Sequence, residues 1–129
     1  MANNRVADIP ISIHVDKQFL DKQSSPENNR YVFAYTVTIS NHGVEAVKLI
    51  SRHWLITDGN NTIQEVKGDG VVGEQPLIAP GAYYRYSSGA LLKTAVGTME
   101  GSYQMRSHSG LEFNALIPLF SLIHPDSLH

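Results

Sequence analysis

The segment "RYVFAYTVTISN", residues 30–41, decides the fold class. Every second position in it carries a large apolar side chain: Tyr31, Phe33, Tyr35, Val37 and Ile39. Successive side chains of a β-strand point to opposite faces, so a period of two predicts a strand that is buried on one face only. The positions between them carry smaller or polar side chains, which suit the other face. The chain therefore contains a half-buried strand here.

The neighbouring segments extend this pattern into a sheet protein. Residues 9–15 alternate in the same way, and the polar stretch 21–29 separates them from residues 30–41, so we expect an antiparallel hairpin with a long loop. Further strands are predicted at residues 46–57, 63–66, 77–78 and 83–87, and a last hairpin around the turn 107–110. No segment has sustained helical spacing. This organisation predicts an all-β, immunoglobulin-like antiparallel β-sandwich.

The third expected strand carries the single tryptophan. Its alternation groups Ile50, Trp54 and Ile56 on one side and Leu49, Leu55 and Thr57 on the other. In immunoglobulin-like sandwiches a tryptophan of the third strand lies in the core, and a tyrosine two residues before the later cysteine forms a hydrogen-bonded corner. Tyr103 stands two residues before Met105, which would fill that cysteine position. Alternatively, both aromatics are ordinary core residues. We expect these side chains to be largely buried: Tyr31, Phe33, Tyr35, Trp54, Tyr103 and Phe113.

Length and charge limit the classes of partner. A chain of 129 residues predicts one domain, with a core at about residues 9–122 and short tails. The 10 basic residues are scattered and are outnumbered by 12 acidic ones, which disfavours nucleic acid and anionic lipid as partners. No apolar run has the length of a membrane span, and cysteine is absent. We expect a soluble cytoplasmic protein without membrane insertion.

The segment "KGDGVVGEQP", residues 67–76, contains the spacing G-x-G-x-x-G. A dinucleotide site needs a helix directly after these glycines and an acidic residue about 20 positions further on. Pro76 and Pro80 prevent such a helix, and no acidic residue lies between Glu74 and Glu100. A phosphate loop would need Lys and then Ser or Thr where this chain has Glu74 and Gln75. The spacing therefore favours a turn or bulge of a β protein.

The same loop is nevertheless the best candidate for a binding site. Its residues are Gly68, Asp69, Gly70, Val71, Val72 and Gly73. The two valines suit a loop that docks on a protein partner, and they equally suit a bulge that buries both in the core. Consecutive N–H groups in a glycine-rich loop can also bind an anion, although Asp69 and Glu74 oppose one more strongly than Lys67 attracts it. All three interpretations remain open at this point.

Catalytic and metal motifs are absent from the sequence. The six histidines show no metal-ligand spacing, so we predict no metal site; the least unfavourable combination is His124, Asp126 and His129 in the C-terminal tail. There is no G-x-S-x-G elbow, and cysteine catalysis is excluded without a thiol. We therefore expect no cofactor and no enzymatic activity.

Four segments together resemble one family. "SSPENNRYVFAYTVTISN", "SRHWLITDGN", "VKGDGVVGEQPLIAPGAYYRYSSG" and "GTMEGSYQM" are similar, in this order, to the ApaG family. The resemblance implies a fibronectin type III-like or immunoglobulin-like sandwich, which occurs alone in bacteria and as a module of eukaryotic F-box proteins. It also implies an association with cobalt and magnesium resistance or efflux. The family's glycine motif falls on Gly68, Gly70 and Gly73, for which nucleotide or pyrophosphate contact has been suggested.

These observations lead to one functional expectation and one alternative. We expect a non-enzymatic module that binds a protein partner whose identity the sequence does not give. The alternative is a regulatory protein that binds pyrophosphate, a nucleotide or a divalent cation through residues 68–73.

Overall fold

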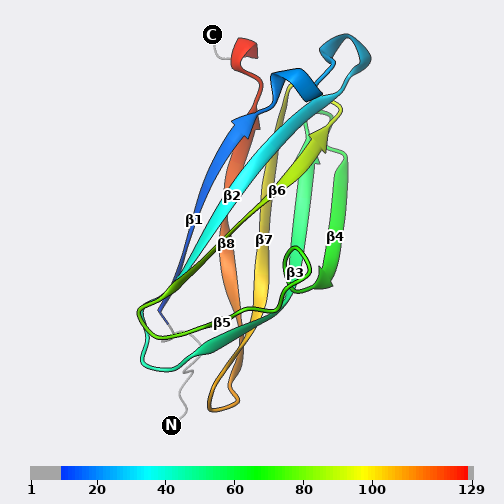
Figure 1. Cartoon of the computed structure of the whole chain (residues 1–129). Coiled ribbons are helices and arrows are strands. Elements are labelled where there is room, and N and C mark those ends of the chain that lie inside the picture. The colour runs from blue at the N-terminus through cyan, green and yellow to red at the C-terminus, as the bar shows by residue number, and fades with distance from the viewer. Residues whose placement is uncertain (1–9, 128–129) are drawn as a thin grey trace.

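Two antiparallel sheets pack face to face in the computed structural model, which describes residues 10–127 (Figure 1). The first sheet has the order β1 (Ile11–Phe19), β2 (Tyr31–Asn41), β6 (Tyr83–Leu92). The second has the order β4 (Ile63–Asp69), β3 (Val47–Asp58), β7 (Val96–Ser107), β8 (Glu112–Ile123), and the short β5 (Leu77–Ile78) also pairs with β3. Short 3₁₀ turns occur at Asp21–Gln23, Pro26–Asn28 and Pro125–Ser127. The predicted all-β sandwich is confirmed.

The opening strand is the centre of the first sheet. β2 pairs with β1 from Ile11 opposite Asn41 to Phe19 opposite Phe33, which confirms the predicted hairpin. Its alternating apolar residues from Phe33 to Ile39 are buried, as the period of two requires. Tyr31 is only partly buried, because it lies at the first position of the strand. Within residues 10–127, no helix is long and apolar enough to cross a membrane.

β3 contains a bulge that the sequence pattern does not reveal. Its pairing with β7 runs from Leu49 opposite Met105 directly to Ser51 opposite Gln104, which leaves Ile50 as an extra residue. An extra residue reverses the alternation of side chains. Leu49 and Trp54 are therefore both buried, although strict alternation along the strand would place their side chains on opposite faces. The predicted grouping of Ile50 with Trp54, opposite Leu49, is wrong for this reason.

Aromatic rings fill the space between the sheets. The Trp54 ring centroid lies 5.5 Å from that of Tyr35, 6.0 Å from Phe120 and 6.3 Å from Tyr103, all in edge-to-face arrangements. Phe33, Tyr35, Trp54, Tyr103 and Phe113 are buried, as predicted, and so is Met105. The Tyr103 hydroxyl shares a hydrogen bond with the Tyr86 hydroxyl of the opposite sheet. Tyr103 thus ties the two sheets together through a side chain.

The two long sides of the sandwich differ. On one side β1 lies along β8 (Figure 1), and the ring of His124 packs edge-to-face on Phe19 with centroids 4.5 Å apart. Lys17 adds a cation–π contact, with its Nζ 5.7 Å from the centroid of Phe120. On the other side the sheets end in β6 and β4, and a cavity opens between them.

Candidate functional site

The glycine loop is a tight hairpin. Gly68 and Asp69 are the last residues of β4, where they pair with Arg52 and Ser51 of β3, so the predicted loop began two residues too early. Beyond them, Val71 and Glu74 exchange two backbone hydrogen bonds of 2.8 and 3.0 Å. The turn itself is therefore short and fixed by its own backbone.

Each glycine of the motif has a local structural setting. Gly70 has a φ of +62°, and a Cβ there would lie 2.1 Å from the Glu74 carbonyl oxygen. Gly73 has a φ of +80° with open space around it. A Cβ on Gly68 would lie 3.0 Å from two nitrogens of the Arg52 guanidinium. The G-x-G-x-x-G spacing thus serves a turn and the packing of one arginine.

The two valines of the loop have opposite environments. Val71 is completely buried and belongs to the hydrophobic core, whereas Val72 has 64% of its surface exposed. Val72 also has a φ of +48°, which is an outlier for a β-branched residue. Burial of both valines and exposure of both valines were the two interpretations from the sequence. The structure combines one of each.

Several polar backbone groups of the loop are engaged within the fold. The Gly70 N–H donates to the Ile50 carbonyl at 2.8 Å, in addition to the two bonds between Val71 and Glu74. The Arg52 Nη1 donates to the carbonyls of Asp69 and Gly70 at 3.1 and 2.9 Å. An anion-binding concavity needs consecutive N–H groups that face solvent. The N–H groups of Gly70 and Val71 face carbonyl oxygens, as does that of the following Glu74, whereas those of Val72 and Gly73 at the tip of the turn donate to no group of the described residues.

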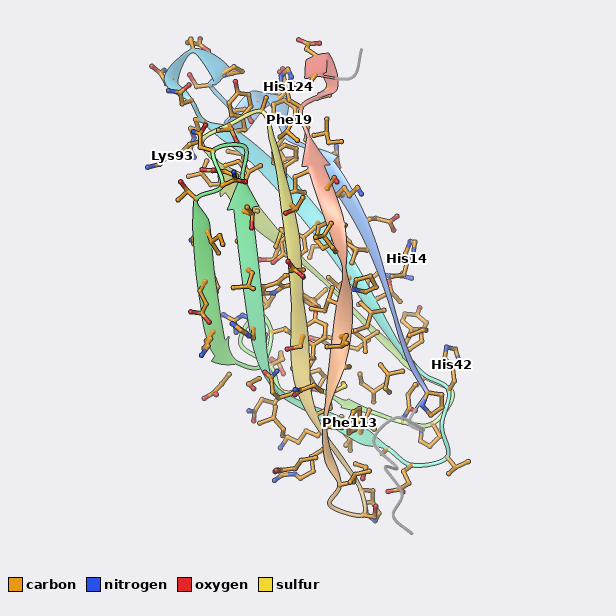
Figure 2. The ribbon with its side chains drawn as sticks, turned by 180° about the vertical axis from the view of Figure 1, so that it is seen from behind. His14, Phe19, His42, Lys93, Phe113 and His124 are labelled. Atoms are coloured by element: carbon orange, nitrogen blue, oxygen red, sulfur yellow. The ribbon has the colours of Figure 1, made fainter. Side chains whose placement is uncertain are left out.

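The histidines are spread over the molecule. His53 Nε2 lies 2.6 Å from Glu65 Oε2, and hydrogen bonding to His53, followed by the charge of Lys67, lowers the pKa of that exposed carboxyl. His14 pairs with Asp16 at 3.2 Å. Figure 2 shows His14 and His42 well apart from His124. Among residues 10–127, no three His, Cys, Asp or Glu side chains form a group that could hold a metal ion.

Of the three candidate metal ligands in the C-terminal tail, the structure describes His124 and Asp126. His124 packs on Phe19 and Tyr31, and its Nδ1 accepts a hydrogen bond from the Asp126 N–H at 3.1 Å. His124, which we assigned to the C-terminal tail, thus belongs to the side of the sandwich that β1 and β8 close. His129 lies outside the described residues.

Arg52 is the functional candidate that the sequence analysis missed. It stands two positions before Trp54 on the face of β3 that looks into the sandwich, and it lines the cavity between β6 and β4. A charged side chain two residues from a core tryptophan was the available signal. Arg52 could not be selected on this signal alone, because the sequence does not show that β3 lies beside an open side of the sandwich.

Comparison with known proteins identifies the family. The family model of the ApaG domain matches residues 21–107. The chain belongs to the ApaG family. It is 56% identical to "Protein ApaG" of Pseudomonas paraeruginosa and 58% identical to that of Thiobacillus denitrificans, in each case over 92% of this chain and 94% of the relative. The resemblance inferred from the four segments is therefore confirmed.

Two solved structures support the ApaG fold. The crystal structure of a putative ApaA protein from Bordetella pertussis is 45% identical, with a TM-score of 0.88 over 91% of this chain and 95% of that one. An X-ray structure of a Northeast Structural Genomics Consortium target is 50% identical, with a TM-score of 0.87 over 92% of this chain and 90% of that one. At these identities the ApaG sandwich described above is the shared fold.

Proposed function

We propose that this ApaG protein is a non-enzymatic module that binds a protein partner through residues 68–73, with Val72 as the apolar contact. The observation that carries the proposal is the conformation of Val72, which is exposed and has a positive φ. A non-glycine residue in the left-handed region costs about 1–3 kcal/mol, and such strain is concentrated at functional sites. Asn or Gly would adopt this conformation more easily, so stability alone does not explain a valine here.

The surroundings of Val72 indicate the chemistry of the partner. Val71 anchors the hairpin in the core, so Val72 is presented on a rigid support. Asp69 and Glu74 are exposed on either side of it. We therefore expect the partner surface to offer an apolar pocket with basic residues at its rim.

A capture experiment tests this role. The wild-type protein and the Val72→Asn variant are immobilised and exposed to a lysate of the native host. Asn tolerates a positive φ, so the variant should be at least as stable as the wild type and should lose a partner that the wild type retains. Val44→Asn is the matched control, because Val44 is 93% exposed and distant in sequence. Equal capture by wild type and Val72→Asn would refute the proposal.

The proposal also includes the absence of catalysis. The matched family model and the ApaG relatives carry names that state no reaction. A screen of hydrolase substrates, including diadenosine polyphosphates, should give no turnover. Activity that survives repurification and is lost on a single polar substitution would contradict this part.

The alternative role, a regulatory protein that binds pyrophosphate, a nucleotide or a divalent cation through residues 68–73, ranks second. The reason is that N–H groups of the loop bond to carbonyl oxygens and its flanking carboxylates repel anions. Titration with pyrophosphate and with ATP should therefore show no saturable binding. Saturable binding that is lost on changing Gly70 would favour the alternative.

A further inference from the structure

The open side of the sandwich contains a cavity of about 550 Å³ between β6 and β4. Its deep wall consists of buried residues, among them Tyr35, Trp54, Leu92 and Met99. One end lies at the β3–β4 turn, where the Gly59 N–H donates to the Thr94 hydroxyl at 2.8 Å. Lys93 stands at this end (Figure 2). Cavities of this volume are in the size range of small-molecule sites.

Polar side chains occupy inward-facing positions around the cavity. Arg52 is on the Trp54 face of β3, Gln64 of β4 is paired with Ile56, and Ser88 of β6 is paired with Tyr35. Directly opposed residues share a face of the sheet, so all three look between the sheets. Inward positions of a sandwich are normally apolar. Gln64 and Ser88 are exposed on the two edge strands and Arg52 is half-buried, so polar side chains from three strands surround the apolar wall of the cavity, as in many small-molecule sites.

The tryptophan at the cavity wall has an unused donor. The Trp54 indole Nε1 is buried and has no hydrogen-bond partner among residues 10–127. Buried indole N–H groups usually have one. Trp54 also lines the cavity, so a ligand that lies against its ring would change the environment of this N–H.

The charged groups of the cavity favour an anion. Arg52 is held by two backbone carbonyls, which fix its position but leave its charge uncompensated. Among residues 10–127, neither Arg52 nor Lys93 forms an ion pair with a carboxylate. Asp58 also lines the cavity, but its Oδ1 accepts the N–H groups of Asn60 and Thr62. The Arg52 end is thus the positive end.

We propose that this cavity binds a small organic anion, with its apolar body against Trp54 and its carboxylate or phosphate group on Arg52. A guanidinium suits both groups, because it presents several N–H donors in one plane. The aromatic and aliphatic wall suits a flat apolar body. The proposal does not depend on the docking role of Val72.

The single tryptophan gives a direct readout by NMR, since the chain has one indole N–H resonance. The protein is titrated with 1-naphthylacetate, with the neutral 1-naphthylacetamide and with 1-naphthyl phosphate. We expect a saturable shift of the Trp54 indole resonance with the anions and at least about tenfold weaker binding of the amide. The stronger of the two anions identifies the preferred group. No saturable shift with either anion, or equal affinity for acetate and acetamide, would overturn the proposal.

Three variants locate the binding. Ser88→Leu places a larger apolar side chain in the cavity while keeping Arg52, and should abolish the shift. Arg52→Gln should weaken the two anions to the level of the amide, whereas the control Arg106→Gln, at an exposed arginine next to Glu112, should bind like the wild type. If Arg52→Gln does not fold, Ser88→Leu decides alone. Wild-type affinity in Ser88→Leu would show that the naphthyl compounds bind elsewhere and would refute the site.

Discussion

Arg52 and Trp54 stand two positions apart on one face of β3 and contribute in different ways. Trp54 packs on three aromatic rings of the core. Arg52 reaches along the edge to carbonyls 17 and 18 residues away. The position of the single tryptophan on the third strand of an immunoglobulin-like sandwich was enough to predict the burial of Trp54. It could not predict the role of Arg52, because the partners of Arg52 are backbone atoms whose position depends on the pairing of β3 with β4.

The contribution of Trp54 to stability can be measured directly. Trp54→Ala removes the largest side chain of the core and should reduce the free energy of unfolding by roughly 3–5 kcal/mol. Far-UV circular dichroism in a denaturant titration gives the value, since the variant has no tryptophan fluorescence. Leu119→Ala, at a residue that is exposed on β8, should change stability by less than about 0.5 kcal/mol. A loss below about 1 kcal/mol for Trp54→Ala would contradict its place in the core.

The buried tyrosine pair predicts a loss of stability at alkaline pH. Burial is the main cause that raises the pKa of both Tyr86 and Tyr103, and the interaction between the two hydroxyls adds to the rise for Tyr103. Above about pH 10 the unfolded tyrosines release protons that the folded ones keep, so the free energy of unfolding falls as pH rises. This part of the stability is complete below about pH 10.

Urea denaturation between about pH 9 and pH 11 tests this slope. The double variant Tyr86→Phe/Tyr103→Phe should lose stability less steeply than the wild type. Tyr83→Phe, at an exposed tyrosine, should follow the wild type. Identical slopes for the double variant and the wild type would exclude the pair as the cause.

The β4 hairpin shows which structural features depend on strand pairing and turn type rather than on residue type. The sequence predicted a turn or bulge at the glycine motif, and a turn is found there. Its start was misplaced because Gly68 and Asp69 look like loop residues, whereas their pairing with Arg52 and Ser51 makes them strand. The sequence also could not predict that Val71 is buried and Val72 exposed. The positive φ of Val72 depends on the type of turn, which the residue types alone do not specify.

Two glycines of this hairpin form a matched pair for substitution. Gly70→Ala places a Cβ against the Glu74 carbonyl oxygen and should cost more than about 3 kcal/mol, since the backbone must move. Gly73→Ala meets open space and should cost only the roughly 1–2 kcal/mol of a left-handed alanine. Chemical denaturation of both variants supplies the comparison. Equal costs would mean that the turn differs from the one described.

The asymmetry of the whole molecule follows from its strand order. β1 and β8 close one side, where His124 is packed on Phe19, while the edges β6 and β4 leave a cavity on the other. Alternation of apolar residues predicted two packed sheets without help from the structure. It could not say which side is open, because that depends on which strands are last in each sheet. The polar residues at inward positions, such as Ser88, become informative only once this order is known.

The arrangement of potential ligands in the whole molecule also predicts how it responds to cations. Among residues 10–127, two histidines contact a carboxylate: His53 lies 2.6 Å from Glu65 and His14 lies 3.2 Å from Asp16. No group of three potential metal ligands forms in this part of the chain. A ligand at a hundredfold excess over its Kd stabilises a native protein by about 2.7 kcal/mol. We expect cobalt or magnesium at about 1 mM to change the free energy of unfolding by less than about 0.5 kcal/mol, relative to potassium chloride of equal ionic strength. A stabilisation above about 1 kcal/mol that disappears in His53→Gln would assign a cation site to His53 and Glu65 and would favour the alternative function.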